Sequence, residues 1–286
     1  MFSKRLSKMA GSCAIAALGL MVGVTACKKK NDNNNIIDAE KTGYAEEQLL
    51  LEQIYDNADR LVSRAATMGA SSLKGGENPL ALCAEVIKDT TTDPNLDRMV
   101  ISFGSADCLG YDGRYRQGRL IVDYNNKLKP NEKGYYYKIT FDGYSVDGNK
   151  LAGHKEVWNV GTNAAGNIQY DIASVDTIYL KDQSGKLTGA SQRTREWFKG
   201  SSTPQTSDDV YRFTGFGHFT RPGGEQYYIE IAKPLVDDLS CNWINEGVIN
   251  IFPEASTQRV LDFGDGQCES EATIDVNGVT RKVVIP

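Results

Sequence analysis

The sequence has 286 residues, of which 40% are hydrophobic and 24% are charged, and this balance excludes both a disordered chain and a protein with many membrane spans. Its 28 glycines do not follow the three-residue repeat of collagen, and together with 14 tyrosines they indicate many turns and many strands. The 37 acidic residues outnumber the 32 lysines and arginines, and the net charge of −5 argues against a nucleic-acid partner.

Residues 1–26 have the pattern of a bacterial export signal. Three basic residues near the start precede a nearly uncharged apolar run over residues 9–26. The run ends in Val24-Thr25-Ala26-Cys27, which resembles the lipobox of bacterial lipoproteins. This resemblance implies cleavage after residue 26 and attachment of acyl chains, palmitate among them, to Cys27. A membrane-spanning helix is the alternative, because the apolar run is close to the shortest one that crosses a bilayer.

Residues 27–38 are expected to form a disordered tether between the lipid and the folded part. Three lysines and a run of asparagines follow Cys27 without any apolar periodicity. The lysines either contact lipid headgroups or only keep the tether soluble, and both interpretations stay open. By resemblance to the sorting rule of lipoproteins, a residue other than aspartate at position 28 predicts the outer membrane, on either its periplasmic or its surface face.

A single long amphipathic helix is expected within residues 39–72. Its apolar residues recur at spacings of three and four, which is typical of one helix face. Acidic residues crowd its first half, Arg64 lies near its end, and Gly69 can terminate it. One helix cannot bury such a face alone, so we expect it to pack on a sheet. The apolar face consists of Leu50, Ile54, Ala58, Leu61, Ala65 and Met68.

Residues 73–286 are expected to form an antiparallel β domain that makes one globular unit with the helix. Apolar and polar residues alternate in short runs, for example at residues 119–124 and 135–141, and glycine, asparagine and aspartate separate the runs. Connections as short as turns favour antiparallel neighbours. The predicted fold is mainly β, a large antiparallel sheet, sandwich or half-barrel of about 12–14 strands with the helix packed on it.

Four of the six cysteines can form disulfides, because one lies in the signal and one carries the lipid. Four cysteines allow three pairings, and the positions of two turns choose among them. If each turn closes a hairpin, the cysteines on either side of it come within reach of one another. A zinc site is the alternative, but the close cysteine pairs of such sites are missing. The expected disulfides are Cys83–Cys108 around the turn at residues 93–97, and Cys241–Cys268 around the turn at residues 253–256.

The two cysteine hairpins also share a sequence pattern. Residues 100–104 read Val-Ile-Ser-Phe-Gly and precede Cys108, while residues 260–264 read Val-Leu-Asp-Phe-Gly and precede Cys268 at the same distance. Valine, phenylalanine, glycine and cysteine thus recur at the same offsets. We interpret the pattern as an internal duplication, the alternative being two unrelated hairpins that both end in Phe-Gly.

Together these features resemble a family of uncharacterised outer-membrane lipoproteins of Bacteroidetes with duplicated Phe-Gly-x-x-x-Cys hairpins. The resemblance rests on the helix beside the tether, the two hairpins, and the run Arg193-Thr194-Arg195-Glu196-Trp197. It also includes residues 235–241, which lead toward Asp262-Phe263-Gly264-Asp265-Gly266. It extends from about residue 45 to the end of the chain and implies neither an activity nor a site.

A search for catalytic motifs finds none. The sequence lacks a nucleophile elbow, a phosphate-binding loop, a zinc-protease motif and an EF-hand loop. His154 and His218 are the only histidines, and both fall in expected strands. Asp262, Asp265 and Glu269 could ligate calcium, although turn chemistry alone also favours Asp-Gly there. We therefore predict a protein that is not an enzyme, with no catalytic residue, no cofactor and no metal.

One expected strand carries the candidate ligand-binding residues. Arg193, Arg195 and Trp197 alternate onto the same face. Such a row could grip an anionic glycan or a lipid headgroup, or it could be a solvated face whose arginines pair with acids of the next strand. The tyrosines at 135–137 alternate between faces, so Tyr136 poses a similar choice between sugar stacking and plain strand propensity.

The leading hypothesis is a non-enzymatic, lipid-anchored cell-envelope protein that binds a ligand or has a structural role. The membrane is its expected partner through the N-terminal lipid, and an envelope protein, a glycan or a lipid is the candidate ligand. Two alternatives stay open. A carrier of a hydrophobic ligand, with the helix as a lid, would contain an enclosed apolar cavity. A carbohydrate hydrolase would contain a cleft with two facing carboxylates.

Overall fold

The computed structural model describes residues 39–67, 73–74, 80–203 and 205–286, which belong to one compact unit, Ile37–Pro286. The expected signal peptide, the lipidation residue Cys27 and the tether lie outside the described residues, as do Met68 and Gly69. Within the described part of the chain, no helix combines the length and the apolar character that crossing a bilayer requires.

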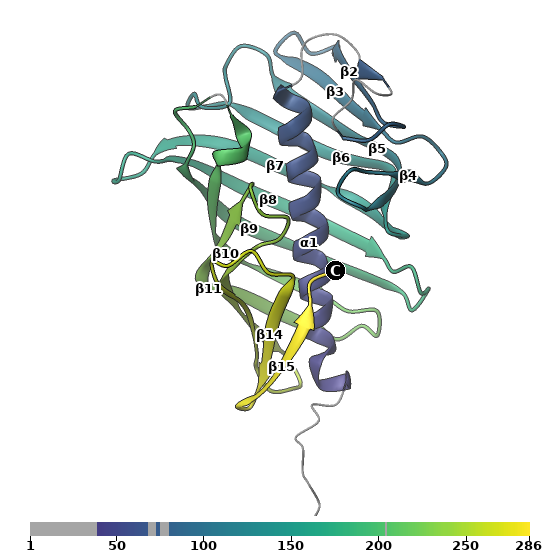
Figure 1. Cartoon of the computed structure of the whole chain (residues 1–286), viewed down its shortest axis with the longest axis vertical. Coiled ribbons are helices and arrows are strands. Elements are labelled where there is room, and N and C mark those ends of the chain that lie inside the picture. The colour runs from purple at the N-terminus through teal and green to yellow at the C-terminus, as the bar shows by residue number, and fades with distance from the viewer. Residues whose placement is uncertain (1–38, 68–72, 75–79, 204) are drawn as a thin grey trace, which may run out of the picture. The chain divides into compact units, whose positions relative to one another are not determined.

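A single open antiparallel sheet contains all fifteen strands of the described residues (Figure 1). Fourteen strands follow one another in chain order, and β4 pairs only with β5. The mainly β fold with one helix packed on the sheet is thereby confirmed. The strands are β1 (Leu73–Lys74), β2 (Glu85–Thr90), β3 (Leu96–Ser102), β4 (Cys108–Leu109), β5 (Tyr115–Asn125), β6 (Tyr136–Val146), β7 (Asn149–Thr162), β8 (Ile168–Tyr179), β9 (Lys186–Lys199), β10 (Val210–Thr220), β11 (Gln226–Asp238), β12 (Glu246–Pro253), β13 (Arg259–Asp265), β14 (Glu271–Val276) and β15 (Val279–Val284).

The helix α1 (Ala39–Thr67) lies against one face of this sheet. It contacts β3 near one edge of the sheet and β12, β13 and β14 near the other, so the sheet curves around it (Figure 1). Every side chain from residue 51 to residue 62 is buried. The sequence predicted one buried face, but the polar face is buried as well, because strands meet the helix on more than one side.

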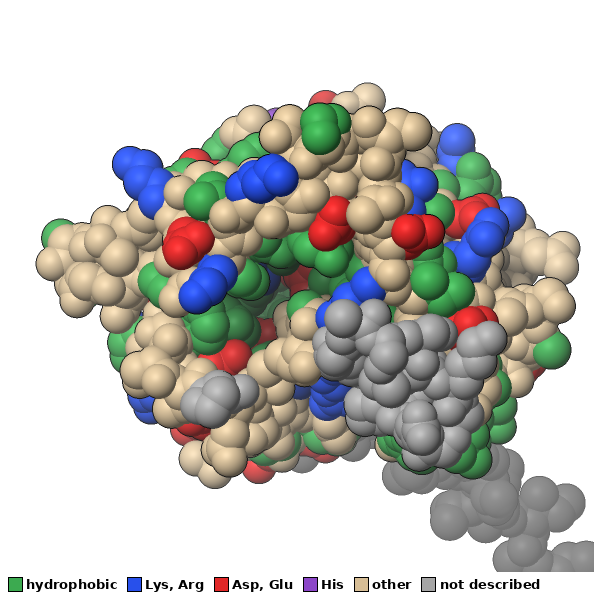
Figure 2. Space-filling model, turned by 90° about the horizontal axis from the view of Figure 1, so that it is seen from above, with side chains coloured by type: hydrophobic (Ala, Val, Ile, Leu, Met, Phe, Trp, Pro, Cys, Tyr) green, Lys and Arg blue, Asp and Glu red, His purple; other side chains and the backbone are tan. Residues whose placement is uncertain are grey.

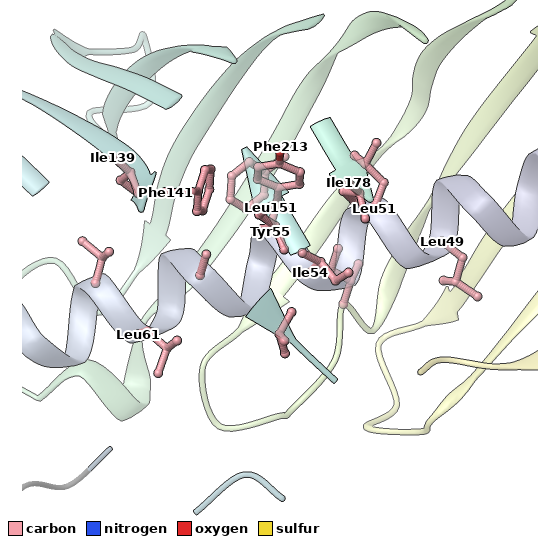
Figure 3. Close-up of a cluster of buried hydrophobic side chains, with 14 of the residues drawn as sticks. Leu49, Leu51, Ile54, Tyr55, Leu61, Ile139, Phe141, Leu151, Ile178 and Phe213 are labelled. Atoms are coloured by element: carbon pink, nitrogen blue, oxygen red, sulfur yellow. The ribbon is translucent and has the colours of Figure 1, made fainter. Parts of the chain in front are cut away.

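Apolar side chains leave the helix in opposite directions. Figure 3 shows Leu51 and Tyr55 on the side that faces Phe141 and Phe213, and Leu61 on the opposite side. The rings of Tyr55 and Phe141 meet edge to face, with centroids 5.7 Å apart. The helix is therefore an internal part of the core and does not merely cover the sheet.

Both expected disulfides, Cys83–Cys108 and Cys241–Cys268, are present, which confirms the predicted pairing. Their Cα atoms are 5.7 and 5.6 Å apart. Each bridge lies just beyond the open end of a hairpin, β2–β3 in the first case and β12–β13 in the second. The bridges thus close the two hairpins where strand pairing ends.

The repeated Phe-Gly pattern occupies equivalent places in the two hairpins. Phe103 and Phe263 are buried in the core. Gly104 and Gly264, which follow them, have φ angles of 77° and 95°, in the left-handed region that favours glycine. The shared residues therefore have the same structural roles in both copies.

Opening either disulfide is expected to lower the free energy of unfolding by about 3 kcal/mol, because each bridge closes a loop of similar length, with sequence separations of 25 and 27 residues. The two losses should add, since the bridges lie in separate hairpins. Urea unfolding of the paired alanine variants of each bridge checks these energies. Non-reducing digestion and mass spectrometry check the pairing, and a peptide that links Cys83 to Cys241 would contradict it.

Candidate functional site

The three candidate residues of β9 all face α1, but they lie in different environments. Arg193 forms an ion pair with Glu52 of the helix, through two hydrogen bonds of 2.6 Å each. Arg195 and Trp197 instead line a cavity beside the last turns of the helix. Tyr136 lies apart from all three, its ring 5.5 Å from that of Trp158 on the other face of the sheet. The structure therefore brings together only Arg195 and Trp197.

The cavity has a volume of about 420 Å³. This lies within the range of roughly 300–1,000 Å³ that is typical of small-molecule sites. Figure 2 shows a hollow on the end of the unit at which α1 ends, with hydrophobic side chains in its wall and charged side chains around its mouth. Aromatic residues contribute much of the lining, namely Tyr124, Tyr135, Tyr137, Tyr170, Trp197 and Tyr211.

Strand register explains why these rings gather. Tyr124 of β5 is the direct partner of Tyr137 of β6. Trp197 of β9 is the direct partner of Tyr211 of β10, and their ring centroids are 5.7 Å apart. Side chains of direct partners in an antiparallel pair project to the same face and touch. Two cross-strand pairs, set by the order of strands in the sheet, thus supply four of the six rings of the wall.

Asp209, immediately before β10, holds part of this wall in place. Its Oδ1 accepts a hydrogen bond of 3.0 Å from the indole Nε1 of Trp197, and its Oδ2 accepts one of 3.3 Å from the hydroxyl of Tyr211. Burial raises the pKa of Asp209, and these hydrogen bonds oppose the rise. Both carboxylate oxygens are thereby engaged in orienting two rings of the cavity.

Arg195 is the buried cation of the cavity, with only 7% of its surface exposed. Its guanidinium carbon lies 4.4 Å from the ring centroid of Tyr170 and 5.1 Å from that of Tyr211. One Nη donates a long hydrogen bond of 3.3 Å to the hydroxyl of Tyr137, and Nε has no partner. Among the residues that the structure describes, no carboxylate lies within ion-pair distance of this guanidinium. An arginine remains charged at any physiological pH.

The phenol of Tyr170 is uncharged at neutral pH. Burial raises the pKa of Tyr170 to about 12, and the positive charge of Arg195 opposes this rise. Its hydroxyl donates a hydrogen bond of 3.1 Å to the carbonyl of Pro130. A backbone carbonyl of the cavity wall therefore holds the ring beside Arg195, whose guanidinium is the buried positive charge of the lining.

A second polar cluster lies between the middle of α1 and the sheet. Arg60 forms ion pairs with Asp56 and with Asp237, and Asp59 forms one with Lys155. The space beside Asp56, Asp59 and Lys155 has a volume of only about 40 Å³, and Arg60 also borders a separate cavity of about 290 Å³. The smaller space holds one or two water molecules and no larger ligand. We assign these ion pairs to the packing of the helix, because they join it to the sheet.

Asp176 of β8 lines the smaller space, and replacing it with asparagine is expected to stabilise the protein above pH 6. Burial raises the pKa of Asp176 from 3.8 to about 6, although Ser174 donates a hydrogen bond to it. The protonated acid is thus favoured in the folded state, and the stability it contributes below pH 3.8 is lost as the pH rises through 6. This loss amounts to about 3 kcal/mol.

The measurement compares urea unfolding of the parent and of Asp176→Asn at pH 4 and at pH 8. The free energies of unfolding of the parent and of Asp176→Asn should differ at pH 8 and agree closely at pH 4. Asp171→Asn, on the exposed face of the same strand, is the matched control and should show no such dependence. A variant that is less stable than the parent at pH 8 would contradict the expectation.

One acidic residue near the second cysteine hairpin, Asp262, has a turn role. Among the described residues, no group of three or more histidine, cysteine or acidic side chains is placed to hold a metal ion. Asp262 instead accepts a hydrogen bond of 2.8 Å from the backbone N–H of Gly264. This is the role that turn chemistry assigns to aspartate before glycine.

The fold and the cavity together define the class of this protein as a long antiparallel meander curved around one internal helix, with an aromatic cavity where that helix ends. In comparisons with protein-family models, with curated proteins and with solved structures, the chain shows no match.

Proposed function

We propose that this is a non-enzymatic, lipid-anchored protein of the outer membrane that binds a small molecule in its aromatic cavity. The observation that carries the proposal is the cavity of about 420 Å³ with six aromatic side chains in its wall. Aromatic rings supply a large apolar contact area together with polar tips, which suits the binding of a small ligand.

The wall is largely formed before any ligand arrives. Asp209 orients Trp197 and Tyr211, and the carbonyl of Pro130 orients Tyr170. Rings that are already held in position lose little conformational freedom on binding, and this favours affinity. A preformed site of this kind supports a binding role better than a purely structural one.

The helix is not suited to act as a lid. It reaches the cavity only through residues in its last two turns, from Val62 onward. Its middle is buried on all sides, and Glu52, Asp59 and Arg60 form ion pairs with the sheet. Movement of the helix would break these pairs and expose the core. We therefore propose that the ligand enters at the mouth of the cavity while the helix stays in place.

Titration with the fluorescent dye phenylnaphthylamine, which is apolar and aromatic, tests the binding proposal. The dye should bind the full-length protein, and Trp197→Ala should weaken binding by about tenfold, equivalent to about 1.4 kcal/mol, because a ring of the wall is lost. Trp158→Ala is the matched control, since Trp158 lies on the other face of the sheet, and it should leave binding unchanged. Absence of binding, or equal effects of both variants, would contradict the proposal.

The lipid anchor has a separate test. Cys27→Ala is expected to abolish labelling by a fatty-acid probe and to release the protein from the membrane fraction, because the thiol that accepts the lipid is missing. Cys13→Ala is the control and should retain both properties, since Cys13 lies within the expected signal. Labelling that persists in Cys27→Ala would contradict the anchor.

A further inference from the structure

We infer that the ligand of the cavity carries an acidic group that pairs with Arg195, an inference that rests on the proposed function. The chemical class is a small organic anion with an apolar or aromatic body. Two observations carry it: the guanidinium is buried without a carboxylate within ion-pair distance among the described residues, and it lines a cavity whose wall is mainly aromatic and apolar.

Three other buried basic residues differ from Arg195 in their surroundings. Arg60, Arg116 and Lys155 are buried to a similar extent, and each forms an ion pair with an aspartate. Arg195 has instead two tyrosine rings and one long hydrogen bond. Attraction to the rings offsets only part of the cost of removing a charge from water. An anion in the cavity would supply the missing compensation.

The protein does not supply this anion from its own side chains. Asp209 lines the cavity, but its oxygens accept hydrogen bonds from Trp197 and Tyr211. Asp59 acts on Arg195 only from beyond ion-pair distance; its Oδ2 pairs with Lys155, and its Oδ1 has no hydrogen-bond partner. Neither carboxylate lies within ion-pair distance of Arg195 in the described part of the chain. The unused N–H donors of the guanidinium are therefore available to an acidic group of a bound ligand.

The rest of the lining indicates what is attached to the acidic group. Val62, Met99, Val122 and Leu128 contribute apolar surface in addition to the rings. The charged side chains of the lining other than Arg195 and Asp209 are of both signs, namely Lys88, Lys129 and Asp97. A guanidinium presents a planar fork of donors that matches a carboxylate through two hydrogen bonds. A ligand with a carboxylate on an aromatic ring or on a short aliphatic chain would match both the guanidinium and the apolar lining.

Two dyes with the same aromatic rings test the inference. Anilinonaphthalene sulfonate carries an acidic group, whereas phenylnaphthylamine carries none. Arg195→Met should weaken binding of the sulfonate by at least about tenfold and change binding of the neutral dye by less than about twofold, since only the first loses an ion pair. Arg195→Lys, which keeps the charge, should restore part of the difference. Near-ultraviolet circular dichroism of each variant checks that dye binding reports a folded cavity.

Displacement of the neutral dye then identifies the chemistry of the ligand. Octanoate and phenylacetate should displace it from the parent protein, and their amides should do so at least about tenfold less effectively. Stronger displacement by octanoate would indicate an aliphatic body, and stronger displacement by phenylacetate an aromatic one.

The outcomes separate this inference from the proposed function. If neither dye binds the folded parent protein, the proposed function fails and the inference fails with it. If the neutral dye binds in the cavity but Arg195→Met weakens both dyes equally, or neither, the inference alone is overturned. Acids and amides that compete equally would also overturn it.

Discussion

Arg193→Met is expected to lower the free energy of unfolding by about 3–5 kcal/mol, whereas Arg195→Met should change it by no more than about 1 kcal/mol. The two arginines lie two residues apart on the same face of β9, and both are largely buried. Removing Arg193 leaves the buried carboxylate of Glu52 with Gln48 as its one remaining side-chain donor among the described residues. Removing Arg195 abolishes two ring contacts but also relieves the cost of a buried, unpaired charge.

Urea unfolding of the two variants, followed by far-ultraviolet circular dichroism, measures this difference. Each variant serves as the control for the other, because both replace an arginine of β9 with methionine. Equal losses would contradict the distinction between a structural arginine and a ligand-binding one. A large loss in Arg195→Met alone would indicate that its stacking on the tyrosines is a major part of the fold.

Ile54→Asp is expected to cost at least about 4–5 kcal/mol and to prevent stable folding. Ile54 is 2% exposed and lies in the middle of α1, where strands surround the helix. The substitution removes a buried aliphatic side chain and places a carboxylate in the core without a cation to pair with it. The expected result is loss of the cooperative thermal transition seen by circular dichroism.

Ala66→Asp provides the matched control on the same helix. Ala66 is exposed in the last turn, where an acidic side chain costs at most about 1 kcal/mol through the helix dipole. The variant should therefore unfold cooperatively at a temperature only slightly below that of the parent. If Ile54→Asp also unfolded at nearly the parent temperature, the helix would not be part of the core.

The sequence was a good guide to features that depend on neighbouring residues. Alternation at residues 119–124 and 135–141 correctly indicated strands, because each strand of the meander pairs with the next one along the chain. The cysteine pairing followed from turns for the same reason. Periodicity also located the helix and one buried face, but it gave no sign that Asp59 and Arg60 are buried as well. Their partners lie on strands far along the sequence, and no local pattern shows that those strands curve over the helix.

The cavity shows even more clearly that local patterns do not predict contacts between distant strands. Arg195 and Trp197 could be recognised as a pair, since they alternate on one strand. Tyr124, Tyr170 and Tyr211 come from three other strands, and only the register of the folded sheet brings them together. Nothing in the sequence distinguishes an arginine that will meet a helical glutamate from one that will meet only tyrosine rings.

The position of α1 also constrains the order in which the chain can fold. Strand pairing in the sheet is local, so hairpins can form as soon as their residues are available. The helix comes first in the folded unit, yet Glu47 pairs with Arg221 and Arg60 pairs with Asp237, at separations of 174 and 177 residues. A helix with this many charged residues gains little stability before those partners arrive. Completion of the core therefore waits for the last third of the chain, and a nascent or unfolded polypeptide would keep α1 unsatisfied until synthesis or export is nearly complete.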